Sequence, residues 1–181
     1  MKTITRKTRE TSVAIGLAIG DGATVVQTGV LFLDHMLATL TRYAGLNGSI
    51  EAEADLKHHL IEDVGIVYGS AVASLASPGA ARFAERTIPM DDALVQVVVD
   101  LGGRPYYSGD LPSDLYDHWM RSFTDNARCT LHIRVLRGRD RHHIVEAAFK
   151  ALGLALRSAL REDTGGPLSM KGVPILKDGS C

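Results

Sequence analysis

The sequence predicts an α+β fold made of two similar halves, each a mixed four-stranded-type sheet with two helices on one face. Two observations lead to this prediction. Six of the seven histidines fall into two matching sets, and strand-like and helix-like segments follow in the same order in each half. Corresponding histidines lie 83 or 84 residues apart, so a single gap aligns the halves. We therefore expect an internal duplication, with repeats over residues 1–90 and 91–181 that form one unit.

Apolar patterning gives the elements of each half. In the first half it predicts two strands joined by a hairpin turn at Asp21-Gly22, then a helix, a strand and a long helix. These segments span residues 12–20, 23–27, 32–43, 50–54 and 59–76. The second half repeats this order over residues 93–100, 105–107, 115–127, 129–136 and 141–161. The segment 162–181, which contains several Gly and Pro residues, is expected to be a loop.

The composition is that of an ordinary soluble globular protein. Of the 181 residues, 45% are hydrophobic and 23% are charged, which excludes the disordered, collagen-like and coiled-coil classes. The net charge of −1 provides no basic field, so neither nucleic acid nor a membrane is expected as a partner. The two cysteines form no disulfide framework, and no segment has the apolar length of a leader or a membrane span. We therefore expect a cytoplasmic protein.

The duplicated histidines form a motif with the chemistry of a metal site. Each half carries an Asp-His pair, followed 23 or 24 residues later by a His-His-x-x-Glu segment. On a helix, the glutamate of this segment shares a face with either imidazole. Nitrogen and carboxylate donors without thiolate favour Mn, Fe, Zn, Co or Ni over a cysteine-based structural zinc site. We predict two transition-metal sites with open positions, drawn from His35, His58, His59, Glu62, His118, His142, His143 and Glu146.

A single His-His pair has a simpler interpretation. At a helix start such a pair is usually a capping or surface feature. Two equally spaced copies are a different matter, because packing does not require imidazole at six corresponding places. His132 has no counterpart in the first half, and we expect it to be structural.

Helix geometry predicts how the ligands divide between sites. Adjacent helical residues diverge by about 100°, so the two histidines of a pair cannot easily reach the same ion. Each site must then include a residue from another element, and a neighbouring subunit can complete a second ion. This leads to the hypothesis of an obligate homo-oligomer in which metal joins the subunits.

Several basic residues lie outside the metal motif. Taken alone, each of them, including Arg82 and Lys150, is expected to be a solvated surface charge. Beside Gly-rich loops, however, Arg104 and the Ser169/Lys171 pair have the hydroxyl, ammonium and backbone donors of a phosphate clamp. Both interpretations are open at this point.

The motifs occur in a specific order along nearly the whole chain. They are Arg9-Glu10-Thr11, Phe32-Leu33-Asp34-His35-Met36-Leu37, His58-His59-Leu60-Ile61-Glu62-Asp63, Arg82-Phe83, Asp100-Leu101-Gly102-Gly103-Arg104-Pro105-Tyr106, the second His-His-x-x-Glu segment with Phe149-Lys150, and Ser169-Met170-Lys171-Gly172. With these motifs the chain resembles the imidazole-glycerol-phosphate dehydratase family, which are lyases of histidine biosynthesis.

The resemblance implies an enzyme that dehydrates D-erythro-imidazole-glycerol phosphate to imidazole-acetol phosphate. It implies about two Mn²⁺ ions per active site, held by the eight ligands above in sites shared between subunits of a homo-oligomer of about 24 chains built from trimers. The ions would stabilise the imidazolate form of the substrate. Glu10, Glu62 and Glu146 would serve in acid/base catalysis. Arg82, Arg104, Lys150, Ser169 and Lys171 would bind the substrate phosphate.

Two other classes of protein would use the same ligands. A metal-templated assembly or storage protein would keep the metal residues without turnover, but the presence of Glu10 and of all the phosphate-binding candidates argues against it. A metal-dependent hydrolase would place water at the open position, but it would not need the Ser169/Lys171 segment.

Overall fold

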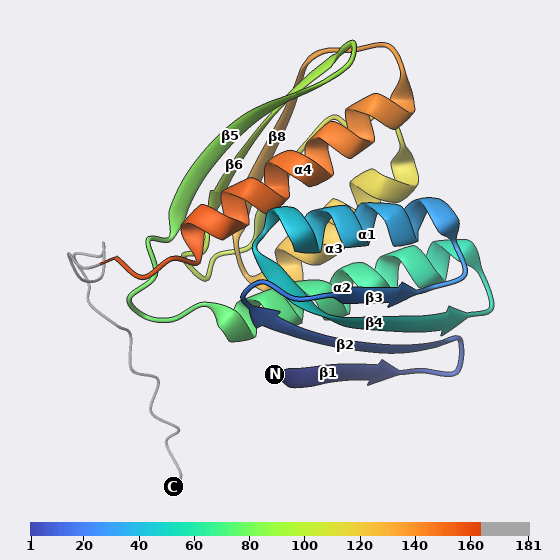
Figure 1. The fold of residues 1–181 in the computed structure, drawn as a ribbon. Helices are drawn as coiled ribbons and strands as arrows, with labels where there is room; N and C mark the ends of the chain where they lie inside the picture. Colours follow the sequence, from blue (N-terminus) through green and yellow to red (C-terminus); the bar gives the residue numbers. More distant parts are fainter. Residues whose placement is uncertain (164–181) are drawn as a thin grey trace, which may run out of the picture.

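Two four-stranded sheets form the outer layers of the molecule, and the helices lie between them (Figure 1). The computed structural model describes residues 1–163. Within this range the first sheet has the order β1 (Lys2–Lys7), β2 (Thr11–Ile19), β4 (Leu46–Ala54), β3 (Thr24–Gln27). The second sheet has the order β5 (Phe83–Met90), β6 (Ala93–Asp100), β8 (Thr130–Arg137), β7 (Tyr106–Ser108). The helices are α1 (Leu31–Tyr43), α2 (Lys57–Leu75), α3 (Asp114–Ala127) and α4 (Arg141–Ala159).

The two sheets have the same topology. In each of them the first three strands of the spatial order pair antiparallel, and the last strand pairs parallel with its neighbour. Each half therefore follows the order β-β-β-α-β-α along the chain. The predicted α+β class with two similar halves is confirmed.

The first strand of each half was not predicted. β1 and β5 are edge strands, and β5 carries Pro89, a residue that sheets tolerate at their edges. Because an edge strand buries only part of one face, its apolar alternation is weak. β5 pairs with β6, so Phe83–Met90 belongs to the second sheet, although the sequence interpretation assigned residues 1–90 to the first repeat.

The predicted hairpin at Asp21-Gly22 is wrong. β4 lies between β2 and β3, pairing antiparallel with β2 and parallel with β3. Apolar alternation determines which face of a strand is buried, but it does not choose the neighbouring strand. A parallel pair needs a crossover connection, and α1 provides it between β3 and β4.

The helices pack in two pairs, and each pair joins the two halves of the chain. α2 packs on α3, and α4 packs on α1. α2 also covers the first sheet, and α4 covers the second sheet. The hydrophobic core is thus continuous from one sheet through the helices to the other. Inside it the rings of Trp119 and Phe123 of α3 are stacked, with 5.4 Å between their centroids.

A glycine lies at each helix crossing. A Cβ atom at Gly69 of α2 would lie 2.4 Å from the carbonyl oxygen of Phe123 on α3. Gly153 of α4 is the duplicated residue, 84 positions later, and a Cβ atom there would lie 2.9 Å from the carbonyl oxygen of Leu40 on α1. The missing side chains let the helix backbones approach closely, which a larger residue would prevent.

Among residues 1–163, none of the helices has the length and apolar character needed to cross a membrane.

Candidate metal centre

The first cluster of predicted ligands joins α2 to α3. His58 and Glu62 lie one turn apart on α2, and His118 reaches them from α3. Glu62 Oε2 lies 3.9 Å from His58 Nε2, and Glu62 Oε1 lies 3.5 Å from His118 Nε2. One ligand atom from each of the three residues lies within 4.8 Å of the other two. Ligand atoms about 2.1 Å from one ion are about 3–4 Å apart, so this spacing suits a single shared ion.

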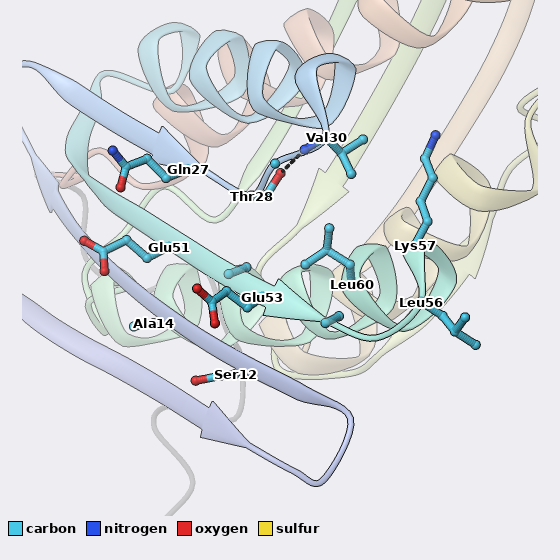
Figure 2. A pocket seen from close by; sticks show the side chains of 13 residues that line it. Ser12, Ala14, Gln27, Thr28, Val30, Glu51, Glu53, Leu56, Lys57 and Leu60 are labelled. Atoms are coloured by element: carbon cyan, nitrogen blue, oxygen red, sulfur yellow. Dashed lines mark hydrogen bonds between the residues drawn. The ribbon is translucent and has the colours of Figure 1, made fainter.

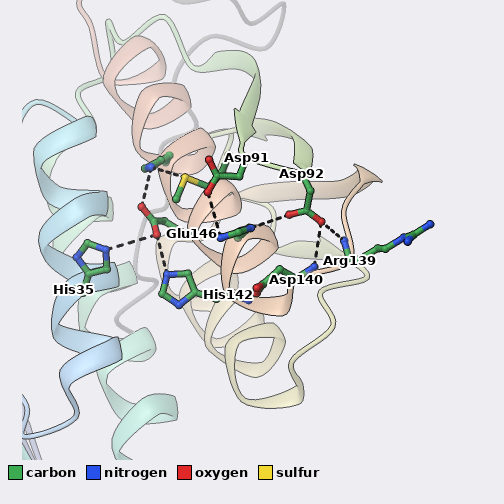
Figure 3. Close-up of polar contacts among 10 residues, drawn as sticks. His35, Asp91, Asp92, Arg139, Asp140, His142 and Glu146 are labelled. Carbon is green, nitrogen blue, oxygen red and sulfur yellow. Dashed lines mark hydrogen bonds and ion pairs between the residues drawn. The ribbon is translucent and has the colours of Figure 1, made fainter.

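The second cluster joins α4 to α1 and repeats the first. His142 and Glu146 lie one turn apart on α4, and His35 reaches them from α1 (Figure 3). Glu146 Oε2 lies 3.2 Å from His142 Nε2 and 3.7 Å from His35 Nε2. Each cluster therefore takes a carboxylate and one imidazole from one half and its second imidazole from the other half.

The two oxygens of Glu146 have different partners. Oε2 faces the two imidazoles, whereas Oε1 accepts a hydrogen bond of 2.8 Å from Lys150 Nζ, one turn further along α4. Burial alone would raise the pKa of Glu146. The hydrogen bond from Lys150 and the neighbouring positive charges together outweigh this effect, so that the pKa is lowered. Lys150 thus keeps the carboxylate ionised and oriented, as a group behind a metal ligand does.

The second histidine of each pair faces a different carboxylate. His59 Nδ1 lies 2.8 Å from Asp55 Oδ1 and 3.7 Å from Glu10 Oε2. Glu10, Asp55 and His59 also offer one ligand atom each within 4.8 Å of one another.

In the second half, His143 Nδ1 lies 2.8 Å from Asp92 Oδ1, and His143 Nε2 lies 3.3 Å from Asp91 Oδ2. Asp92 also accepts hydrogen bonds from the backbone N–H groups of Arg139 and Asp140 (Figure 3). The adjacent histidines thus point to separate groups, as the helical period requires.

These contacts shift the pKa values of both partners. The hydrogen bond to Asp55 raises the pKa of His59, and the bond to Asp92 raises the pKa of His143. In return the pKa of Asp55 is lowered by His59, and the pKa of Asp92 is lowered to about 2 by His143 and by the two backbone N–H groups. A carboxylate on Nδ1 fixes the orientation of an imidazole ring, which is the usual arrangement behind a metal-ligating histidine.

One atom tests whether the first cluster suits a metal ion. His118 Nε2 is buried and has no hydrogen-bond partner among the described residues. A buried polar atom without a partner is costly, and a bound cation would satisfy it. The surrounding donors are imidazole nitrogen and carboxylate oxygen, the set that divalent transition metals prefer. The residues present therefore fit such an ion.

The predicted phosphate-binding residues lie in different places. Lys150 is at the second cluster, whereas the N–H of Arg82 donates to the carbonyl of Ala159 at the far end of α4, about 20 Å along the helix from Glu146. Arg82 also donates hydrogen bonds of 2.5 and 3.0 Å to Asp100, which raise its pKa. The carbonyl of Arg104 accepts a bond from Thr130 at the start of β8. Ser169 and Lys171 lie outside the described residues.

A groove lies between the first sheet and the start of α2. Figure 2 shows it between Ser12, Glu51 and Glu53 of the sheet and Leu56 and Lys57 at the start of α2. Of the described residues that were predicted as ligands, acids or phosphate binders, none lines this groove.

Sequence reasoning missed the acidic partners of the outer histidines. Asp55 precedes His59 by four residues, and Asp91-Asp92 forms the turn between β5 and β6. The turn was not recognised because β5 was not predicted. His132, expected to be structural, lies on β8 with its ring 5.5 Å from that of Tyr106.

Comparison with known proteins identifies the family. The family model described as imidazoleglycerol-phosphate dehydratase matches residues 28–156. The imidazoleglycerol-phosphate dehydratase of Pyrobaculum aerophilum is 46% identical over 93% of this chain and 97% of its own length. That of Caldivirga maquilingensis is 41% identical over 94% of this chain and 96% of its own.

The chain belongs to the imidazoleglycerol-phosphate dehydratase family. The predicted family is thereby confirmed, and so is the prediction of an enzyme of the hydro-lyase class. Solved structures agree. A crystal structure of IGPD from Pyrococcus furiosus in complex with (S)-C348 superposes with a TM-score of 0.87 at 38% identity, covering 94% of this chain and all of that one. The imidazoleglycerol-phosphate dehydratase of Staphylococcus aureus gives a TM-score of 0.79 at 34% identity, covering 90% of this chain and all of its own.

Proposed function

We propose that the chain converts imidazoleglycerol phosphate to imidazole-acetol phosphate in histidine biosynthesis, with metal ions held at the two clusters. The observation that carries this proposal is the pair of matching clusters, each with two imidazoles and one carboxylate, in a chain whose relatives are named as this dehydratase.

Manganese is the metal we propose for the site. The ligands would be the inner residues of the two clusters together with the outer histidines: His35, His58, His59, Glu62, His118, His142, His143 and Glu146. Mn²⁺ bound by these residues would supply a Lewis acid that stabilises the imidazolate form of the substrate ring. Because the outer histidines face away from the clusters of their own chain, we propose that subunits share the ions.

Glu10 is the residue we propose for proton removal. Its side chain is 59% exposed at the turn between β1 and β2, with its carboxylate 3.7 Å from His59. Glu146 is only 8% exposed and is bound to Lys150, so it is better placed as a ligand. Glu62, partly exposed, is the other carboxylate available for acid/base work.

The proton transfers balance as a dehydration. After the ring N–H proton passes to a carboxylate of the site, electron density from the ring would help to expel the hydroxyl on the adjacent carbon, which would leave as water after protonation by a second group. Glu10 would take the proton from the next carbon, the ring nitrogen would regain a proton, and the resulting enol would tautomerise to the ketone. The chain's own contribution is to orient the ring and to hold the carboxylate at the reacting carbon.

The phosphate would be bound by residues of more than one subunit. Lys150 lies at the second cluster, but Arg82 is about 20 Å from it along α4, too far to reach the same small substrate within one chain. We therefore propose that a neighbouring copy supplies Arg82 to each site, and that Arg104, Ser169 and Lys171 also bind the phosphate.

A homo-oligomer, built from trimers into about 24 chains, is part of this proposal. The second sheet offers a surface for it, since Phe83, Val98 and Tyr106 are exposed large hydrophobic residues of its strands. Gel filtration before and after chelation tests the assembly. A monomer that keeps its metal at full occupancy would contradict it.

Turnover after chelation and Mn²⁺ re-addition tests the activity. The ketone product and the metal content are measured on the same sample, and activity should return as metal returns to about two ions per chain. Glu10→Gln should keep metal content and assembly while losing all but a residual rate of dehydration. Stoichiometric metal without turnover in the wild type would instead support a non-catalytic assembly protein.

A further inference from the structure

A buried carboxylate on α2 has no role in the proposed chemistry so far. Asp63 follows the proposed ligand Glu62 directly, yet its side chain is turned into the protein and is 8% exposed. Thr11 donates a short hydrogen bond to Asp63 Oδ2, and Arg6 Nε lies 3.2 Å from Oδ1. Both partners belong to the β1–β2 hairpin, so Asp63 ties this hairpin to the helix that carries His58, His59 and Glu62.

The same network continues to Glu10. The hydroxyls of Thr8 and Thr11 are hydrogen-bonded at 2.9 Å, and Thr8 Oγ1 also accepts the backbone N–H of Thr11 at 2.9 Å and that of Glu10 at 3.1 Å. On the other side, the carbonyl of Glu10 accepts the N–H of Asp55 at 3.0 Å. The backbone of Glu10 is therefore fixed from both directions, while its side chain is 59% exposed and lies beside His59.

The second half shows that the fold does not need this network. The residue duplicated from Asp63 is Ala147, 84 positions later, and the hairpin positions that correspond to Thr8 and Thr11 are Met90 and Ala93. Apolar residues thus fill the equivalent space. Burying a carboxylate costs free energy unless it is paired, so such a departure from the duplicated pattern marks a functional requirement.

We propose that Asp63 is a positioning residue of the active site: it anchors the β1–β2 turn on the metal-binding helix and thereby sets the place of the Glu10 carboxylate. This inference rests on the proposed function. A general base must stand within hydrogen-bond reach of its proton, and a misplacement of about 1 Å can cost about 100-fold in rate. Asp63 touches neither ion nor substrate, and it acts through Thr11 and Thr8.

The test compares Asp63→Ala in two backgrounds. In the wild-type background with saturating Mn²⁺, we expect kcat to fall by about 10- to 100-fold with little change in KM and unchanged metal content. Amide hydrogen exchange of Glu10 and Thr11 should become faster, which is a readout independent of activity. In the Glu10→Gln background, Asp63→Ala should not lower the residual rate further, because the two residues act as one unit.

Controls separate positioning from loss of stability. Tyr68→Phe removes another buried hydrogen bond of α2, to Thr41, and should lower the unfolding midpoint without changing kcat. Thr11→Val should reproduce the effect of Asp63→Ala, and Thr11→Ser should restore activity; these two variants decide the question if Asp63→Ala does not fold.

Two results would overturn the inference. One is a loss of rate on Asp63→Ala in the Glu10→Gln background that is as large as the loss in the wild-type background. The other is an unchanged kcat of Asp63→Ala although the amides of Glu10 and Thr11 exchange faster. An inactive wild-type enzyme would refute the proposed function itself, and it is recognised before any variant is compared.

Discussion

Gly69→Ala should weaken Mn²⁺ binding at the first cluster, formed by His58, Glu62 and His118. It should leave Mn²⁺ binding at the second cluster unchanged. The new Cβ would lie 2.4 Å from the carbonyl oxygen of Phe123 and 2.8 Å from the amide nitrogen of Ala127. Since ordinary contacts of Cβ atoms begin near 3.4 Å, α3 has to move away from α2 by up to about 1 Å. His118 is on α3, whereas its partners His58 and Glu62 are on α2, so the displacement opens the first cluster.

The expected cost follows from two opposing effects. Overpacking costs about 1–3 kcal/mol, and the higher helix propensity of alanine returns about 1 kcal/mol. Metal–ligand distances tolerate about 0.2 Å, so most of the displacement acts on the site. We expect about 1.4 kcal/mol of the net cost to fall on ion binding, which corresponds to a tenfold weaker affinity of this cluster for Mn²⁺.

The assay is a Mn²⁺ titration against a competing chelator. His35→Ala and His118→Ala backgrounds each leave one cluster to be measured. Gly69→Ala should weaken the cluster of His58, Glu62 and His118, and Gly153→Ala should weaken the other one. Ser70→Ala is the matched control, because within residues 1–163 the side chain of this neighbour of Gly69 bonds only to the carbonyl of Ile66 in its own helix. Equal weakening of both clusters by Gly69→Ala would refute the role assigned to the helix crossings.

Two further predictions concern the core. Burial raises the pKa of Cys129 to about 12, so about 10⁻⁴ of its thiol is ionised at pH 8. In the Cys181→Ser variant, alkylation of Cys129 should therefore be slow until the chain unfolds. Rapid alkylation of the folded protein would contradict the burial of Cys129. Tyr68→Phe loses the 3.0 Å hydrogen bond to Thr41 and should lower the free energy of unfolding by about 1 kcal/mol in a urea titration, whereas no change would mean that the bond contributes nothing net.

The central elements of the fold could be predicted because their apolar periods are strong. The helices and the inner strands β2, β6 (Ala93–Asp100) and β8 were predicted at nearly their observed bounds, whereas β4 (Leu46–Ala54) was predicted only from residue 50 onward. β1 and β5 could not be predicted, because their pairing depends on a sheet edge that exists only in the folded protein. For the same reason, nothing local indicated that β4 separates β2 from β3.

The composition of the clusters could be predicted only in part. Helix geometry separates His58 from His59, and it required a ligand from another element. Which element supplies it depends on the packing of α2 on α3, a long-range contact without a local pattern. A signal was available, however: Gly69 and Gly153 are duplicated with the same spacing as the histidines, and a glycine within a helix often marks a close approach.

The crossed helix pairs make the two halves mutually dependent. Since each cluster takes His118 or His35 from the half that does not supply its carboxylate, neither half alone holds a complete cluster. If the clusters bind metal as proposed, a change in either half disturbs both clusters, which agrees with the duplication of the ligands and of the crossing glycines.

Residues outside this requirement are free to diverge, and they do so at particular places. Asp63 corresponds to Ala147, and Lys150 corresponds to Ile66. The first difference anchors the turn of Glu10, and the second orients Glu146. The duplicated residues thus form the two His/Glu clusters, and under the proposed function the residues that break the duplication are those through which the two halves would take different parts in the reaction.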